Sequence, residues 1–147
     1  MPYKYRRAGA ADKEAIYNIY SSVMRQFISD IWGWDEAWQR DDFEKYYIPA
    51  NITVIEGGAE IIGYAQVEEK DAEWFIRMLA VLPDHRLKGI GTEIIQELIR
   101  SKRRKGKQLR LEVFRINSAA QSFYKRLGFR AVDEDANSLV FEFQDEG

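Results

Sequence analysis

The pattern of hydrophobic and polar positions divides the first part of the chain into clear segments. Residues 3–8 alternate between the two kinds, which predicts a strand. Residues 11 to about 27 place apolar side chains on one helix face, and these are Ile16, Ile19, Tyr20, Val23 and Phe27. Gly33 interrupts this pattern, and residues 35–47 predict a second, aromatic-rich helix that Pro49 ends.

The middle of the chain changes to the period of strands and then returns to that of a helix. Residues 51–58 and 59–69 predict two strands joined at Gly57-Gly58, which is a hairpin signal. Residues 73–81 predict a third strand of the same meander. A helix is expected at about 90–105, where one face carries Ile90, Ile94, Ile95, Leu98 and Ile99.

The last part of the chain predicts a strand at 107–114, a short helix at 117–127 and a closing hairpin of residues 129–135 and 138–143. The expected order is β, α, α, β, β, β, α, β, α, β, β, without an internal repeat or a linker. We therefore expect a single α/β domain over residues 1–147.

Composition narrows the chemistry that these elements can carry. Hydrophobic residues make up 46% and charged residues 31%, which suits a globular domain with a core. With 0 Cys and 1 His, His85, the chain has no thiolate nucleophile and too few ligands for a usual zinc site. No apolar stretch approaches the ~20 residues of a membrane helix, and the first residues do not form a secretory signal. We expect a cytoplasmic protein without a bound metal or a membrane partner.

The charge balance argues against a dedicated nucleic-acid binder, because the formal net charge is -2. The basic run at residues 102–105 is interpreted as the solvated last turn of a helix, where cations suit the helix dipole. We therefore expect no nucleic-acid partner, and binding through residues 102–107 stays a third alternative.

A loop with two glycines joins the third strand of the meander to the helix at about 90–105. Gly89 and Gly91 would let an anion approach the main chain at the helix N-terminus, and Arg86 and Lys88 add positive charge there. The dinucleotide fingerprint fails, because Ile94 stands where its third glycine belongs, and no Walker A sequence is present. The loop therefore predicts binding of a phosphate-bearing ligand.

Two stretches resemble the GCN5-related N-acetyltransferase (GNAT) superfamily, which moves acetyl groups from acetyl-CoA to amines. The loop matches the R/Q-x-x-G-x-G/A signature as Arg86-Leu87-Lys88-Gly89-Ile90-Gly91, with a leucine where a small or basic residue is usual. A second cofactor-binding motif is matched by Asn117, Ala120, Tyr124 and Leu127-Gly128-Phe129. The resemblance covers essentially the whole chain. It implies an α/β fold with a mixed, mostly antiparallel twisted sheet and helices on both faces.

The resemblance implies which residues bind acetyl-CoA. They are Leu79, Ala80, Val81, Arg86, Leu87, Lys88, Gly89, Ile90, Gly91, Thr92, Asn117 and Tyr124. In the family, the strand before the loop splays from the next strand, and its main chain binds the pantetheine arm. The matching tyrosine can protonate the departing thiolate, which makes Tyr124 the implied acid; a core tyrosine is the alternative.

Glu112 is the implied general base. It alternates with Leu111 and Val113, so its side chain is expected on the opposite face of the sheet. It precedes Tyr124 by the same twelve residues as the base of related enzymes that acetylate ribosomal-protein N-termini. A solvent-facing strand charge is the alternative, and the rival carboxylates are Glu68, Glu69 and Glu73.

The acceptor is expected near Trp34, Asp35 and Trp38, since aromatic faces and carboxylates favour a cationic amine. The implied function is acetyl transfer to a small-molecule or peptide amine. Without cysteine, the amine would attack acetyl-CoA directly. The alternative is a non-catalytic acyl-CoA-binding or sensing module of the same fold. The oligomeric state, a homodimer included, stays open.

Overall fold

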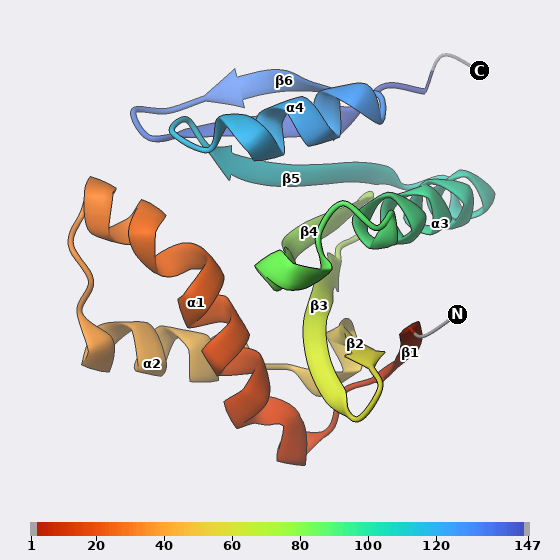
Figure 1. The fold of residues 1–147 in the computed structure, drawn as a ribbon. Helices are drawn as coiled ribbons and strands as arrows, with labels where there is room; N and C mark the ends of the chain where they lie inside the picture. The colour runs from red at the N-terminus through yellow and green to blue at the C-terminus, as the bar shows by residue number, and fades with distance from the viewer. Residues whose placement is uncertain (1–2, 146–147) are drawn as a thin grey trace. The chain divides into compact units, whose positions relative to one another are not determined.

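The computed structural model describes residues 3–145, and its helices and strands follow the order predicted from the sequence (Figure 1). The strands are β1 (Tyr3–Arg7), β2 (Ile52–Gly57), β3 (Glu60–Glu69), β4 (Glu73–Val81), β5 (Gln108–Phe114), β6 (Phe129–Glu134) and β7 (Ser138–Phe143). The α-helices are α1 (Lys13–Ile31), α2 (Glu36–Tyr46), α3 (Ile90–Lys105) and α4 (Ser118–Arg126). Short 3-10 turns lie at Ala10–Asp12, Pro49–Asn51 and Pro83–His85.

Within the described residues, the strands form a seven-stranded sheet in the order β1-β2-β3-β4-β5-β7-β6. The pairs β1–β2, β2–β3, β5–β7 and β6–β7 are antiparallel. Strands β4 and β5 are parallel from Glu73↔Gln108 to Ile76↔Leu111. A parallel pair needs a long crossover, which here contains α3. The predicted fold class, with a mixed and mostly antiparallel sheet, is confirmed, and the splay of β4 from β5 stays a prediction.

Helix α1 runs past the predicted end at about residue 27 and ends at Ile31. The reason is that Ile28 continues the apolar face and is buried at 5% exposure. Tyr17 is also buried, although it lies outside the face read from the sequence. The buried surface of α1 is therefore wider than the amphipathic pattern predicts.

The contacts of the chain divide it into two units, residues 1–66 with 78–88 and residues 67–77 with 89–147. In the first unit, α1 packs on the strands through a core of apolar side chains. This core contains Ala8, Ile16, Ile19, Ile52, Val54, Tyr64 and Ala80. No helix among residues 3–145 has the length and hydropathy needed to cross a membrane.

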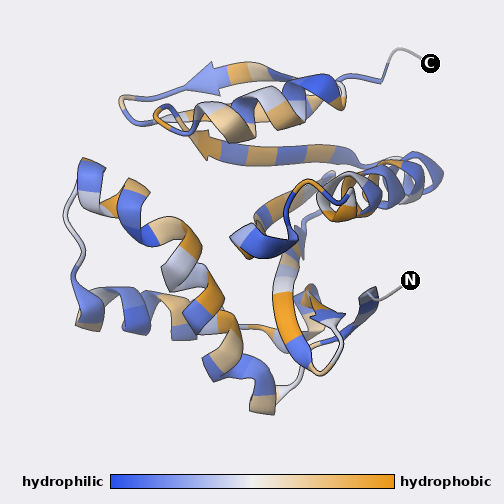
Figure 2. Cartoon of the chain, in the orientation of Figure 1, coloured by the Kyte–Doolittle hydropathy of each residue, from blue (hydrophilic) through white to orange (hydrophobic). Residues whose placement is uncertain are grey.

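In the second unit, strands β5, β7 and β6 present one apolar face. It is made by Leu109, Leu111, Val113, Phe129, Phe141 and Phe143. Figure 2 shows the alternation along β5 that separates this face from the polar one. The apolar side chains Ile95 and Ile99 of α3 are buried, and α3 contacts β5. Lys102 continues the same helix face and is only 5% exposed, so the interpretation of residues 102–105 as a solvated turn is wrong for Lys102.

Candidate functional site

The strand end that precedes the predicted cofactor loop lies in the first unit. Leu79, Ala80 and Val81 close β4, and Ala80 is buried. Gly63 of β3 lies close against this strand end, because a Cβ built there would be 2.5 Å from the Ala80 carbonyl oxygen. A side chain at this position would push the strands apart. The Arg86 Nε donates to the Val81 carbonyl oxygen at 2.8 Å, which ties the following loop to the strand end.

The glycine loop (residues 86–92) contains two left-handed residues. Leu87 has a φ of 62° and is the only non-glycine residue with a positive φ among residues 3–145. Its side chain is fully exposed, so no packing compensates for this conformation. Gly89 has a φ of 82° and is the N-cap of α3. Glycine adopts this geometry freely, whereas a non-glycine residue in it is strained by about 1–3 kcal/mol.

The start of α3 presents main-chain N–H groups rather than a capped end. No side chain of the described residues caps the helix at Gly89. Ile90 is buried and anchors the first turn, which continues through Gly91 and Thr92. Gly91 has no positive φ, so only its small size can assist the approach of a ligand. Lys88 is exposed immediately before this turn.

The residues of the second motif lie in the second unit. Asn117 is the N-cap of α4, and its Oδ1 accepts from the Ala120 N–H at 3.1 Å. Tyr124 is buried at 8% exposure, with edge-to-face contacts to Phe123 and Phe129 at centroid distances of 5.0 and 5.5 Å. Burial raises the pKa of the Tyr124 hydroxyl, so it stays protonated at neutral pH. The Tyr124 hydroxyl has no hydrogen-bond partner among residues 3–145. Every fully buried polar side-chain atom of these residues does have a partner, so the Tyr124 oxygen is not fully buried. The hydroxyl therefore reaches accessible space.

Glu112 is exposed on β5, directly opposite Val140 of β7. Its side chain leaves the strand on the polar face, as predicted, because Leu111 and Val113 occupy the apolar one. Tyr124 packs on Phe129, which belongs to that apolar face. The implied base and the implied acid therefore lie toward opposite faces of strands β5, β7 and β6.

The carboxylates that rival Glu112 are already paired. Glu68 lies 3.4 Å from the Arg77 guanidinium, Glu69 lies 3.5 Å from the Lys107 ammonium, and Glu73 lies 3.9 Å from the Arg110 guanidinium. Glu112 has no such ion pair among residues 3–145. Among these carboxylates, Glu112 is therefore the one without an ion-pair partner in the part of the chain that the structure describes.

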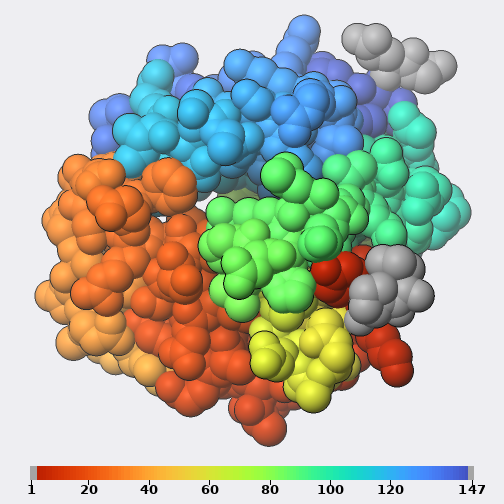
Figure 3. Space-filling view, in the orientation of Figure 1, coloured from red at the N-terminus to blue at the C-terminus, as the bar shows by residue number. Residues whose placement is uncertain are grey.

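The predicted acceptor residues lie at the α1–α2 corner (residues 31–40), which is part of the surface, coloured orange, in Figure 3. The Asp35 Oδ1 accepts from the Trp38 N–H at 3.0 Å and caps α2. The Arg25 guanidinium lies 5.0 Å from the Trp34 ring centroid, so one face of this ring already meets a cation. Trp38 is 60% exposed. Of the two predicted aromatic residues, Trp38 is thus the more open to an acceptor.

The sequence marked Glu36 only as one of several acidic residues in this segment and did not predict its bonds to Tyr17 and Trp34. The Tyr17 hydroxyl donates to Glu36 Oε2 at 2.8 Å, and the Trp34 Nε1 donates to Glu36 Oε1 at 2.9 Å. The residue types alone gave no signal for these bonds, because acidic residues are common in the first turn of any helix.

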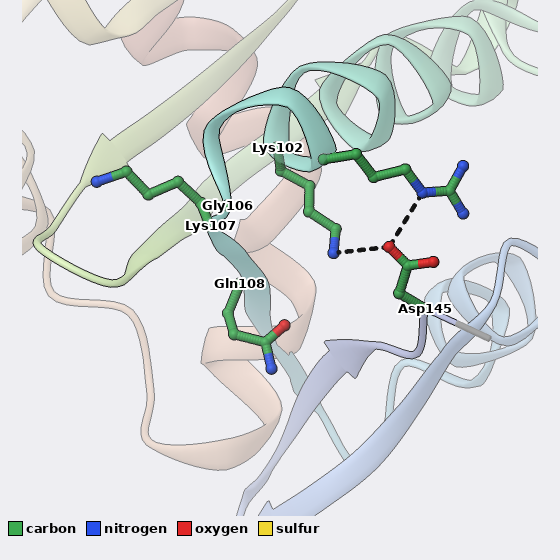
Figure 4. Close-up of a pocket in the computed structure, with 6 residues that line it drawn as sticks. Lys102, Gly106, Lys107, Gln108 and Asp145 are labelled. Carbon is green, nitrogen blue, oxygen red and sulfur yellow. Dashed lines mark hydrogen bonds and ion pairs between the residues drawn. The ribbon is translucent and has the colours of Figure 1, made fainter. Parts of the chain in front are cut away.

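An open pocket lies at the C-terminal end of α3 in the second unit (Figure 4). Its lining residues are Lys102, Arg103, Gly106, Lys107, Gln108 and Asp145. Asp145 Oδ2 lies 3.3 Å from the Lys102 Nζ and 3.1 Å from the Arg103 Nε. The Lys107 ammonium donates to two main-chain carbonyl oxygens at 2.9 Å. These cations already have protein partners, which weakens the nucleic-acid alternative. No group of three or more potential metal ligands occurs within residues 3–145.

Known proteins share this sequence pattern and this fold. A sequence profile of the Acetyltransferase (GNAT) family matches residues 13–129. The structure is similar to the PaiA N-acetyltransferase from Thermoplasma acidophilum in complex with coenzyme A, with a TM-score of 0.79 and 20% identity over 99% of this chain and 100% of that chain. It is also similar to Naa50 from Arabidopsis thaliana in complex with the bisubstrate analogue CoA-Ac-MVNAL, with a TM-score of 0.70 and 16% identity over 99% of this chain and 100% of that chain.

A curated relative is the thialysine N-epsilon-acetyltransferase of Mus musculus. It is 32% identical over 95 residues, which are 60% of this chain and 56% of the relative. The chain therefore spans a little over half the length of this relative. At identities below 25%, the two solved structures establish the similarity of fold and leave the chemistry to be argued from the residues.

Proposed function

Because the chain belongs to the Acetyltransferase (GNAT) family, we propose that it is an N-acetyltransferase that moves the acetyl group of acetyl-CoA to a primary amine. The acceptor is a small molecule or a peptide, and its nitrogen attacks the acetyl carbonyl directly. The chain has 0 Cys, which leaves no cysteine to form an acyl-enzyme.

The observation that carries this proposal is the uncapped start of α3. This helix has 16 residues, and its N-terminal N–H groups carry partial positive charge that suits a phosphate. The left-handed Gly89 leads the chain into the helix without a side chain, and Arg86 and Lys88 add cations before it. The pyrophosphate of CoA is a ligand of fitting charge for this loop.

The proposed reaction needs a proton acceptor and a proton donor. The amine substrate, as an ammonium ion, first loses a proton to Glu112 or to water, because only the neutral amine can attack the acetyl carbon. The nitrogen then bonds to the acetyl carbon, the carbon–sulfur bond breaks, and the electron pair leaves on the CoA sulfur. Tyr124 gives its hydroxyl proton to this thiolate, and the surplus proton that the amide nitrogen loses returns through solvent to the Tyr124 oxygen. The raised pKa of Tyr124 weakens the driving force of this transfer, so a moderate contribution is expected.

The acceptor class is drawn from the relatives. The mouse relative is named for the side-chain amine of thialysine, and the plant structure holds an analogue that joins CoA to a peptide. A lysine-like amine and a peptide N-terminus are therefore the first two acceptors to test. Asp35 and the exposed Trp38 provide a carboxylate and an aromatic face for either cation.

The test is release of free thiol from acetyl-CoA in the presence of lysine-type amines, aliphatic diamines or peptides with a free N-terminus. The chain has 0 Cys, so the protein itself contributes no thiol. We expect thiol release to require both substrates, with the mass of the amine raised by one acetyl group. Release without acetylation of any amine would contradict the proposal.

A non-catalytic acyl-CoA-binding module is the second candidate. The observation in its favour is that Glu112 and Tyr124 lie toward opposite faces of strands β5, β7 and β6. Such a module binds CoA without turnover and is indifferent to Glu112→Gln and Tyr124→Phe. The thiol assay with these two variants separates the candidates.

A further inference from the structure

Both carboxylate oxygens of Glu36 hold an aromatic side chain of the first unit. The Tyr17 hydroxyl donates to Oε2 at 2.8 Å, and the Trp34 indole Nε1 donates to Oε1 at 2.9 Å. From this pair of bonds we infer that Glu36 is a positioning residue that fixes the Trp34 indole and thereby sets acceptor affinity. The part about the acceptor rests on the proposed function, whereas the part about the indole does not.

The bond to Tyr17 gives Glu36 a firm attachment to α1. Tyr17 is only 3% exposed, and its ring lies 5.1 Å from that of Phe43 and 6.1 Å from that of Tyr20. An immobile hydroxyl holds one oxygen of the carboxylate, which leaves the other oxygen at a defined place for the indole N–H. The position of Trp34 at the α1–α2 corner is thereby linked to the buried surface of α1.

The charges around this carboxylate favour its ionised form. Hydrogen bonds from Trp34 and then from Tyr17 lower the pKa of Glu36, and the Arg25 and Arg40 guanidinium groups act in the same direction. Arg25 lies 4.0 Å from Glu36 Oε1 and also over the Trp34 ring. Both oxygens therefore remain acceptors at neutral pH.

Trp34 has a second, weaker support. Its ring lies 6.2 Å from that of Tyr20, at an interplanar angle of 39°. This tilted contact restricts the indole but does not select one direction for its N–H. Glu36 supplies that direction, so its removal should leave Trp34 in place and free to change rotamer.

The first measurement follows the indole N–H resonances by NMR and does not depend on turnover. The chain has 4 Trp, and Trp34→Phe assigns the signal of Trp34. We expect Glu36→Ala to shift this resonance upfield and to broaden it, since the carboxylate no longer accepts the proton. Glu36→Gln keeps an acceptor oxygen and should move the resonance less. Glu44→Gln is the control on the same helix, because Glu44 pairs with Lys13 at 3.2 Å instead.

The second measurement uses the amine that the thiol assay identifies. Glu36→Ala should raise the acceptor KM roughly 3- to 10-fold, the loss of about one hydrogen bond, with kcat and the KM for acetyl-CoA unchanged. Glu36→Gln should restore part of this loss, and Glu44→Gln should have no effect. The melting temperatures of all variants show whether they fold. If Glu36→Ala does not fold, Glu36→Gln is the variant that tests the proposal.

Each result decides a separate statement. An unchanged Trp34 resonance in both Glu36 variants would overturn the positioning role. A shifted resonance with an unchanged acceptor KM would overturn the link to acceptor affinity. Failure of the proposed function shows itself differently, as the absence of turnover by the wild type with every amine, and the NMR result then still decides the role of Glu36.

Discussion

The glycine loop and the α1–α2 corner differ in whether main-chain or side-chain groups define their structure. The glycine loop offers the main chain, through the left-handed Gly89 and the uncapped start of α3. The α1–α2 corner is held by side chains, through the bonds of Glu36 to Tyr17 and Trp34. The first arrangement suits a cofactor that all members of a family share, and the second can vary from one acceptor to another.

This contrast predicts how the two regions respond to substitution. A change of backbone conformation in the glycine loop should affect cofactor binding and leave the acceptor site intact. A change of side chain at the corner should affect acceptor affinity and leave cofactor binding intact. The following predictions are ordered from the largest expected effect to the smallest.

Gly89→Val should weaken CoA binding by more than about 100-fold, since a β-branched residue cannot easily hold the φ of 82° that opens the helix start. Isothermal titration calorimetry measures this loss. The control is Gly58→Val, because Gly58 has a φ of 67° and, like Gly89, no atom within 4 Å of a built Cβ. Equal loss of CoA affinity in both variants would mark the effect as general destabilisation.

Tyr124→Phe should lower kcat roughly 10- to 100-fold and keep acetyl-CoA affinity, because only the proton donor is removed and the ring still packs on Phe129. Tyr47→Phe is the matched control, since its hydroxyl donates to the Gly9 carbonyl oxygen at 2.6 Å in the first unit. It should lower stability without lowering kcat. An unchanged kcat in Tyr124→Phe, with chemistry rate-limiting, would identify Tyr124 as a packing residue.

Asp35→Asn should raise the acceptor KM about 3- to 10-fold and leave CoA affinity unchanged, because it removes the charge and retains a good N-cap. Steady-state kinetics with the identified amine measures this effect. Asp35→Ala, which also loses the cap, should in addition lower the free energy of unfolding by about 1 kcal/mol. If Asp35→Asn damages cofactor and acceptor affinity equally, Asp35 has a structural role only.

Leu87→Asn should raise the free energy of unfolding by about 0.5–1 kcal/mol, because asparagine tolerates a left-handed backbone better than leucine. The Leu87 side chain is fully exposed, so little packing is lost. Urea denaturation measures the difference. Ile116→Asn, at an exposed position without a positive φ, should not stabilise the chain. Destabilisation by Leu87→Asn would show that the leucine side chain has a contact of its own.

The glycine loop could be predicted from the sequence because its signals are local. A strand, two glycines, basic residues and an amphipathic helix follow one another along the chain, and Gly89 indeed takes the left-handed conformation at the helix start. Asn117 was marked by its motif in the same way and caps α4. The positive φ of Leu87 had no such signal, since leucine rarely adopts it.

The α1–α2 corner could not be predicted in the same detail. The sequence indicated its Trp and acidic residues, yet the bond between Tyr17 and Glu36 joins residues 19 apart on different helices. Lys102 shows the same limit, because its burial depends on Asp145 and on the Phe143 ring, 5.3 Å from its ammonium group. Side-chain partners that are distant in sequence follow from the packing of elements, which periodicity does not specify.

Titration of CoA into the wild-type protein, followed by calorimetry, tests the central claim most directly. We predict one CoA per chain, bound with measurable heat, and a melting temperature that rises with CoA concentration because the ligand binds the folded state. If about 1 mM CoA produces neither binding heat nor a shift of the melting temperature, the Kd is weaker than about 1 mM. This result would contradict the claim that the glycine loop binds CoA.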